Sequence, residues 1–159
     1  MNDLPFTEVE IATIQNGVVV DKIYKRNTLT KKGREMIAKI ICGLHDRPIR
    51  YIQIGTGSEE PTEDDTQLES FYAETNAVAW AFYWWTWEWD EKGKPMIVWY
   101  FSNMVLECSF YFSESVTITE AGLFDAPKSE NPNMYARITF GEKEYKRDSV
   151  MRIRWGIHV

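Results

Sequence analysis

The sequence predicts a mainly β fold, an antiparallel β-sandwich with one amphipathic helix over about residues 30–43 packed on it. Three observations support this prediction. Short runs of alternating apolar and polar residues fill most of the chain, an Asn-Gly pair separates two β-rich runs near the start, and one segment alone has helical periodicity. With 159 residues, of which 44% are hydrophobic, residues 1–159 form a single predicted β-sandwich domain.

Composition narrows the classes of partner. The net charge of -6 argues against general nucleic-acid binding. No apolar run reaches the length of a membrane span, and the opening residues MNDLPFTEVE lack the features of a signal peptide. We therefore expect a protein made in a cytoplasm, with neither nucleic acid nor membrane as its partner.

The first predicted strands are Glu8–Ile14 and Val18–Tyr24. Asn16 and Gly17 between them both tolerate positive φ, which predicts a tight hairpin. The predicted helix follows, with Thr30 as N-cap and Gly43 at the position expected just after its end. Its predicted apolar face consists of Met36, Ile37, Ile40, Ile41 and Leu44.

An acidic loop follows the next predicted strand, Pro48–Ile54. Residues 58–74 contain no Lys or Arg, whereas residues 22–50 hold nine bases against two acids. We expect an exposed loop, with a short helical turn starting between Asp65 and Leu68. Such charge asymmetry suits head-to-tail packing of copies, so Asp64 and Asp65 are candidate interface residues.

Residues 78–89, VAWAFYWWTWEW, are aromatic on both predicted faces, so this strand is either covered on both sides or part of an interface. A turn at residues 90–94 and two further strands, Met96–Ser102 and Val105–Phe112, are expected next. The candidate interface residues in the aromatic strand are Trp80, Trp84, Trp85, Trp87 and Trp89.

The segment Val116–Phe140 is predicted to be a strand, a corner, a loop and a strand. Gly122 is expected to form a bulge or corner with a backbone conformation that other residues avoid, and Leu123 and Phe124 are expected in the core. Glu120 is expected to accept hydrogen bonds from backbone donors at this corner. A charged connection at residues 142–148 then leads to a last strand, Ser149–Val159.

Candidate chemistry is weak throughout. The segment Gly55–Gly57 lacks the Lys and spacing of a phosphate loop, and the acidic loop lacks the spacing of a calcium-binding loop. His45 and His158 have no metal-ligand spacing, and Cys42 and Cys108 are expected to be buried free thiols. The sequence thus predicts no catalytic, cofactor-binding or metal-binding residues.

Two alternatives remain for the aromatic strand. Its Trp side chains between Trp84 and Trp89 suit stacking on sugars, which would make the protein a carbohydrate-binding adhesion module for host recognition. Less favoured is sugar hydrolysis by Glu88 or Asp90, since paired carboxylates next to aromatic rings also occur in glycosidases.

Several motifs occur in an order that resembles small virion proteins of tailed bacteriophages. These motifs are Asn27-x-Leu29-Thr30-x-x-Gly33, Ile52-Gln53-Ile54-Gly55-Thr56-Gly57, Pro61, Asp65-Thr66-x-Leu68-Glu69, Ile118–Phe124, Met134–Phe140 and Ile153-x-Trp155-x-Ile157. The resemblance implies a non-enzymatic structural component of a virion, made in the host cytoplasm. It also implies symmetric copies, as a trimer or ring, that contact other virion proteins on the capsid surface (decoration) or on the tail, fibre or baseplate.

Overall fold

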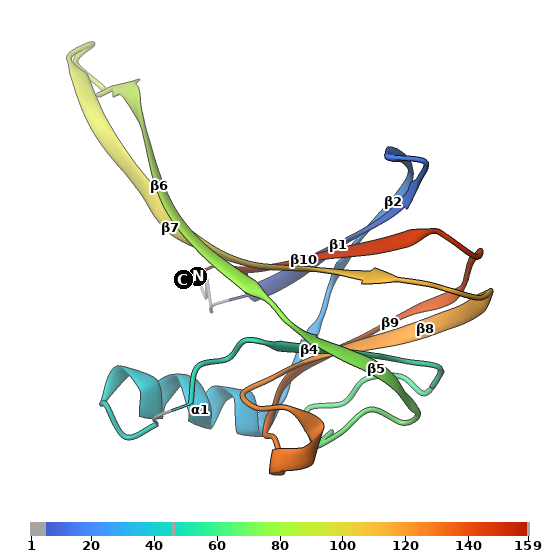
Figure 1. Cartoon of the computed structure of the whole chain (residues 1–159). Helices are drawn as coiled ribbons and strands as arrows, with labels where there is room; N and C mark the ends of the chain where they lie inside the picture. The colour runs from blue at the N-terminus through green and yellow to red at the C-terminus, as the bar shows by residue number, and fades with distance from the viewer. Residues whose placement is uncertain (1–5, 46, 159) are drawn as a thin grey trace.

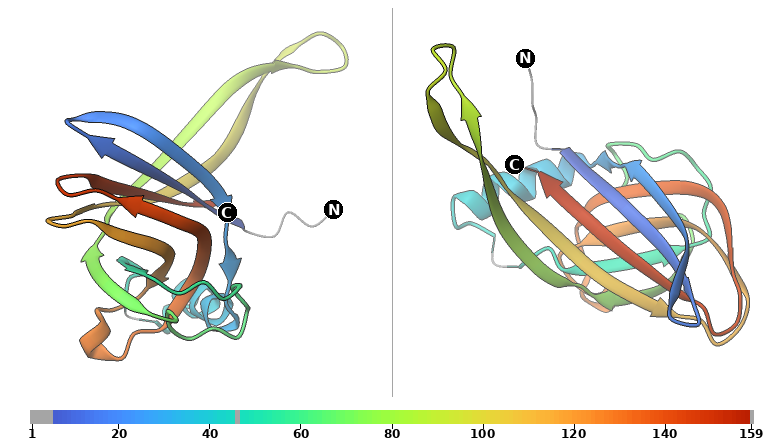
Figure 2. Two further views of the ribbon diagram at one scale, coloured as in Figure 1. Left: turned by 90° about the vertical axis from the view of Figure 1, so that its right-hand side faces the viewer. Right: turned by 90° about the horizontal axis from the view of Figure 1, so that it is seen from above.

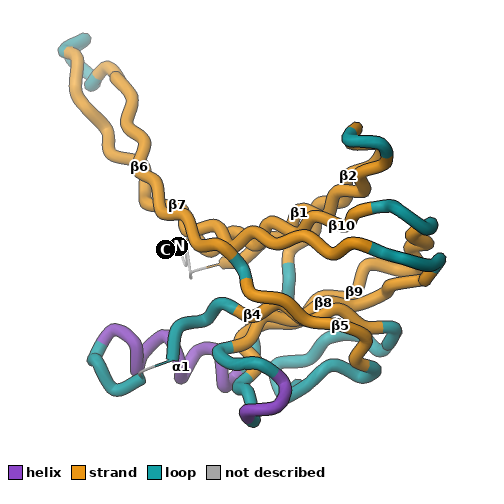
Figure 3. Tube along the Cα trace, in the orientation of Figure 1, coloured by secondary structure: helices purple, strands orange, loops and turns teal. Residues whose placement is uncertain are grey.

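Two five-stranded antiparallel sheets face each other in the structure, a computed structural model that describes residues 6–45 and 47–158 (Figures 1 and 3). The side chains of residues 6, 81–88, 96–103 and 158 are not described. The first sheet has the order β2 (Val18–Arg26), β1 (Phe6–Gln15), β10 (Val150–His158), β7 (Pro95–Tyr111) and β6 (Val78–Trp89). The second has the order β3 (Thr28–Leu29), β9 (Met134–Tyr145), β8 (Val116–Phe124), β4 (Tyr51–Gly55) and β5 (Phe71–Asn76).

The fold class predicted from the sequence is confirmed: the structure is mainly β, with two antiparallel sheets and one α-helix among the described residues. The helix is α1 (Lys31–Ile41), and a single 3-10 turn, η1 (Lys128–Glu130), lies between β8 and β9. None of the helices in the described part of the chain has the length and apolar character needed to cross a membrane.

The predicted first hairpin is confirmed. Asn16 has φ 51° and Gly17 has φ 77°, so both turn residues occupy the left-handed region that a two-residue hairpin turn requires. The register of the pair runs from Glu8 opposite Arg26 to Gln15 opposite Val18. An Asn-Gly pair was therefore sufficient to locate the turn.

The helix begins as predicted, because the Thr30 side chain accepts a hydrogen bond from the backbone N–H of Gly33 at 2.8 Å. Gly33 does more than the sequence indicated. A Cβ at this position would lie 2.2 Å from the carbonyl oxygen of Tyr135 in β9, so the absence of a side chain allows α1 to approach the second sheet closely.

The predicted apolar face of α1 is only partly correct. Met36 is buried in the core and Ile37 packs against it, but Ile40, Ile41 and Leu44 are exposed. Only the first half of the helix lies against the sheet, whereas Ile41 and Leu44, with 79% and 77% of their surface exposed, extend beyond it. Periodicity identified the apolar residues but not where the sheet beneath them ends.

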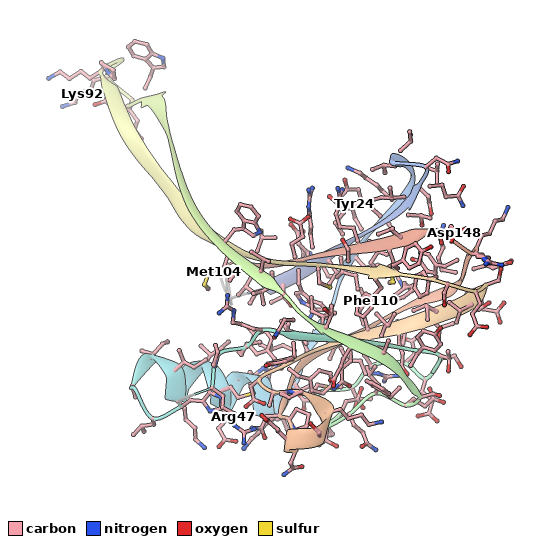
Figure 4. The ribbon with its side chains drawn as sticks, in the orientation of Figure 1. Tyr24, Arg47, Lys92, Met104, Phe110 and Asp148 are labelled. Carbon is pink, nitrogen blue, oxygen red and sulfur yellow. The ribbon has the colours of Figure 1, made fainter. Side chains whose placement is uncertain are left out.

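The sandwich core lies between the two sheets. Among the described side chains of β7 and β10, the buried ones alternate along each strand, namely Leu106, Cys108, Phe110, Met151, Ile153, Trp155 and Ile157. Phe112, just past the end of β7, is buried as well. Figure 4 shows Phe110 pointing into the space between the sheets.

Other predicted boundaries differ from the structure. The two strands expected at 96–102 and 105–112 are one continuous strand, β7, of 17 residues. The connection expected at 142–148 is mostly strand, since β9 continues to Tyr145. No helical turn occurs between Asp65 and Leu68. Cys108 is buried but Cys42 is exposed, and both are free thiols.

Candidate functional site

The predicted structural corner is buried, and it is a strand with bulges rather than a corner, because the register of β8 with β9 shifts between Ile118 and Glu120 and between Leu123 and Phe124. Glu120 and Leu123 are fully buried, Phe124 is 1% exposed, and all three lie in the continuous strand β8. Gly122 does not have a positive φ, which contradicts the prediction of an unfavourable backbone conformation. Its requirement is for space, because a Cβ there would lie 2.8 Å from the Phe124 ring and 3.0 Å from Leu68 Cδ2.

The carboxylate of Glu120 accepts backbone hydrogen bonds, as predicted, but the donors lie at the two ends of the acidic loop and not at the predicted corner. One carboxylate oxygen, Oε1, accepts hydrogen bonds from the backbone N–H of Gly57 at 3.0 Å and of Ser70 at 2.8 Å. The other, Oε2, accepts one from the backbone N–H of Glu69 at 3.2 Å. The two ends of this loop are thereby fixed to one buried side chain.

Arg137 in β9 completes this cluster. Its Nε donates to Glu120 Oε2 at 3.0 Å, and its Nη1 donates to Asp65 Oδ2 at 2.9 Å. The second terminal nitrogen, Nη2, lies 2.8 Å from Glu120 Oε2 and 3.9 Å from Glu69 Oε2, in the geometry of ion pairs rather than directed hydrogen bonds. With only 3% of its side chain exposed, Arg137 needs these carboxylates to offset its loss of hydration.

The pKa values in the cluster follow from these contacts. Burial disfavours the charged form of Asp65, but hydrogen bonds from Thr62 and Arg137 outweigh burial and lower the pKa of this carboxyl. Burial likewise disfavours the charged form of Arg137, and its contacts with Asp65 and Glu120 outweigh that effect and raise its pKa. Both Asp65 and Arg137 are therefore ionised at neutral pH.

The acidic loop binds groups of its own chain. Glu69 Oε2 accepts hydrogen bonds from the backbone N–H of Ser58 at 2.7 Å and of Glu59 at 2.9 Å. Asp64 pairs with Lys31 of α1 at 2.7 Å, and its side chain keeps 72% exposure. Of the two acids predicted to form an interface, Asp65 lies within the Arg137 cluster and Asp64 remains accessible, so a role in an interface stays a prediction.

The convergence of carboxylates here does not resemble a cation site. Among residues 6–45 and 47–158, no group of three or more His, Cys, Asp or Glu side chains is placed to hold a metal ion. The position between Asp65, Glu69 and Glu120 is taken by the guanidinium of Arg137. His45 Nε2 lies 3.1 Å from Asp125 Oδ2, away from this cluster, and the side chain of His158 is outside the described residues.

The second candidate site is an arm formed by β6 and the first part of β7. The strand β10 pairs with residues 103–111 of β7. Residues 82–89 of β6 pair with residues 95–103 of β7, the part that precedes the pairing with β10. Beyond Asn103, among residues 6–45 and 47–158, the two strands thus pair only with each other. Figures 1 and 2 show this arm extending well beyond the rest of both sheets, and Figure 4 places Met104 at its base and Lys92 at its tip.

The arm carries the predicted aromatic interface residues. Trp80 near its base is 53% exposed and Trp89 near its tip is 70% exposed. The side chains of Trp84, Trp85 and Trp87, and that of Glu88, lie outside the described residues. Two described Trp side chains of the predicted interface are therefore accessible to a partner.

Asp90 has a structural role in the turn at the tip of the arm. Its Oδ1 accepts hydrogen bonds from the backbone N–H of Lys92 at 2.8 Å and of Lys94 at 2.9 Å, and Gly93 has φ 73°. A carboxylate that holds a turn in this way serves the backbone, which weakens the hydrolase hypothesis for this residue.

Two concave regions lie on the body. One, of about 710 Å³, lies between α1 and the segment after β2 and is lined in part by Leu29, Ile37 and Ile41. The other, of about 510 Å³, is more polar and is lined in part by Gln53 and Lys128. Neither lining set combines a nucleophile with a hydrogen-bonded base, the arrangement that covalent catalysis requires.

The sequence did not predict the ion pairs of Arg137, although this residue lies in the motif Met134–Phe140. Its partners Glu120 and Asp65 lie 17 and 72 residues away, so no local pattern links them.

Comparison with protein-family models, with curated proteins and with solved structures finds no match to this chain.

Proposed function

We propose that the protein is a structural, non-enzymatic component of a bacteriophage virion. In this proposal, copies assemble symmetrically on the capsid surface or on the tail, fibre or baseplate, and the arm makes contacts with neighbouring subunits. The order of the sequence motifs supports the assignment to virion structural proteins. The single structural observation that supports an assembly role is the projecting β6–β7 arm with its exposed Trp side chains.

The physical argument concerns the stability of the arm. An isolated two-stranded ribbon is at best marginally stable in water, because each strand lacks a second neighbour and a packed face. Exposed Trp80 and Trp89 add large apolar side chains that a partner can cover. Contact with another subunit would supply both the missing packing and the cover, which is why we assign the arm to assembly.

The proposal is tested with an arm-deletion variant in which residues 83–102 are replaced by Asn-Gly. Phe82 and Asn103 are register partners, so a two-residue turn can join them. The measurement is the amount of protein in purified particles of the phage that encodes it. Wild type is expected in the particles and the deletion variant is expected to be absent. The control Tyr24→Ser, which removes an exposed aromatic residue from β2, should be incorporated normally.

A second candidate function is a carbohydrate-binding adhesion module that uses residues 84–89. The 70% exposure of Trp89 favours it, because sugars stack on accessible aromatic rings. Titration with a broad set of glycans should then change Trp fluorescence, and Trp89→Ser should weaken that change. Particles that contain the protein, together with no response to any glycan, would favour the structural role alone.

A further inference from the structure

The four edges of the two sheets differ in how well they are protected from other strands. Natural sheets protect their edges with charged residues, Pro or short strands, because an unpaired row of N–H and C=O groups is a template for pairing. In the second sheet, β3 has two residues and β5 has six, which include Glu74. In the first sheet, β2 has nine residues, of which Asp21, Lys22, Lys25 and Arg26 are charged.

The remaining edge, β6, has little of this protection, apart from a bulge at Tyr83 that shifts its register with β7. It has 12 residues, and Glu88 is the one charged residue among them. In the described part of the chain β6 pairs with β7 alone, so its other side presents an unpaired row of backbone groups about 40 Å long, at roughly 3.4 Å per residue. Val78, Trp80 and Trp89 along this edge strand are 59%, 53% and 70% exposed.

From this comparison we infer that β6 of one copy pairs antiparallel with β6 of a second copy about a two-fold axis. The two five-stranded sheets then join into one ten-stranded sheet across the dimer. This inference rests on the proposed assembly role and deepens it, since it names the partner of the arm and the way in which the arm binds.

Charge favours a second copy as the occupant. The arm, residues 78–103, carries three acids and two bases, a net charge of -1, whereas the chain carries -6. The difference of -5 belongs to the rest of the chain, so two copies repel each other least where their arms meet. The nearly neutral arm also offers little attraction for a nucleic acid or a strongly charged peptide.

Shape and area agree with this occupant. A strand edge about 40 Å long and roughly 10 Å wide gives each copy about 400 Å² of contact, half the usual share of a stable interface, and aromatic side chains flanking the edge add to it. A two-fold axis brings the same edge of both copies together, as self-complementary interfaces require. The arm projects beyond the rest of the sheet (Figure 2), so most of the edge of β6 lies away from the body.

The test compares matched lysine substitutions at the two edges of the first sheet. Val78→Lys with Trp80→Lys alters the β6 edge, and Val20→Lys with Tyr24→Lys alters the β2 edge. All four side chains are more than half exposed, at 59%, 53%, 54% and 67%, so neither variant disturbs the core. Sedimentation or light scattering over a micromolar concentration series measures the dimer, and circular dichroism verifies the fold.

We expect wild type and the β2 variant to dimerise equally. The β6 variant should dimerise at least about tenfold more weakly, because pairing brings like charges together in the new sheet. Equal loss in both variants, loss in the β2 variant alone, or a wild type of three subunits would overturn the inference. A monomeric wild type that is nevertheless found in virions would overturn it too, while leaving the proposed function intact. A β6-dependent dimer absent from virions would support the pairing and reject the virion role.

Discussion

At the scale of single residues, the most consequential group is the carboxylate of Glu120. It is fully buried, and its two oxygens accept three backbone N–H groups from the ends of the acidic loop and contact Arg137. One side chain thereby links β8, β9 and a loop between β4 and β5. Loss of its charge should affect the loop and the second sheet together.

Replacing Glu120 by Gln should lower the free energy of unfolding by about 3 kcal/mol, because the buried Arg137 loses a charged partner and an NH₂ group replaces an acceptor that faces N–H donors. Urea unfolding measures the change. Glu114→Gln removes the same charge at an exposed site and should be nearly neutral. Equal stability of the two variants would contradict the role assigned to Glu120.

Acid should weaken the link between Asp65 and Arg137. The folded-state pKa of Asp65 lies below its ordinary value of 3.8, so the pair stabilises the fold fully above that pH and loses its effect as pH falls through the lower folded value. Asp65→Asn should therefore be less stable than wild type by about 1–2 kcal/mol at neutral pH. The difference should shrink below pH 3.8 in unfolding curves measured from pH 2 to 7; a constant difference would disagree with this account.

The two cysteines should differ sharply in reactivity. Cys42 is exposed, whereas burial and the neighbouring Glu107 raise the pKa of the Cys108 thiol to about 12. A thiol reagent should modify one cysteine per chain at pH 8 in the native protein, and both in denaturant. Cys42→Ser should abolish the native reaction, and modification of Cys108 at the rate of Cys42 would indicate that the core opens readily.

At the scale of elements, the contact between α1 and β9 depends on Gly33. Thr30 caps the helix and its backbone N–H donates to the carbonyl oxygen of Tyr135 at 3.1 Å, the same oxygen that Gly33 approaches. The helix is therefore seated at its first turn, while Ile41 and Leu44 at the other end stay exposed.

Gly33→Ala should destabilise the protein, although Ala favours helices by about 1 kcal/mol over Gly. The added Cβ would lie 2.2 Å from a backbone oxygen, which forces the helix away from β9 at an expected net loss of about 2 kcal/mol. Thermal unfolding measures it. Lys32→Ala at the half-buried neighbouring position serves as control, and a stabilised Gly33→Ala would show that α1 does not rest on β9.

Elements with local signals were predictable from the sequence. The first hairpin and the start of α1 depend on Asn16-Gly17 and Thr30, whose chemistry acts within a few residues. The single strand β7 was divided in the prediction because the residues between Ser102 and Val105 are weak β-formers, and long pairing with β6 and β10 overrides that preference.

The candidate site was predictable only in part. Alternation and aromatic content singled out β6, and Glu120 was recognised as a group that accepts backbone hydrogen bonds. The sequence carried no sign that Arg137 binds Asp65, because that contact spans 72 residues. The sequence also did not show that the aromatic strand projects as an arm. The arm begins where β10 ends, because from there, in the described part of the chain, β7 pairs with β6 and no longer with β10.

At the scale of the whole molecule, the body and the arm are structurally separable. Among the described residues, sheet pairing with β10 ends at Asn103, so the arm beyond that point is joined to the body through β6 and β7. The body should therefore fold without the arm, whatever the arm binds.

The arm-deletion variant, with residues 83–102 replaced by Asn-Gly, should unfold cooperatively with a Tm within about 3 °C of that of the monomeric wild type. Differential scanning calorimetry at low protein concentration measures both. Replacing Ile153 by Ala in the fully buried part of β10 provides the opposite control, with an expected loss of about 3 kcal/mol. A deletion variant that fails to fold would place the arm within the cooperative unit.

The order of strands in the first sheet also determines when the protein can fold during translation. The strand β10 lies between β1 and β7, and its register joins Phe6 to His158. Because β10 leaves the ribosome after the other nine strands, the β1–β2 hairpin and the β6–β7 hairpin wait as separate pieces with apolar faces open. Nascent chains are thus most exposed to chaperones, proteases and premature association until β10 has left the ribosome and paired.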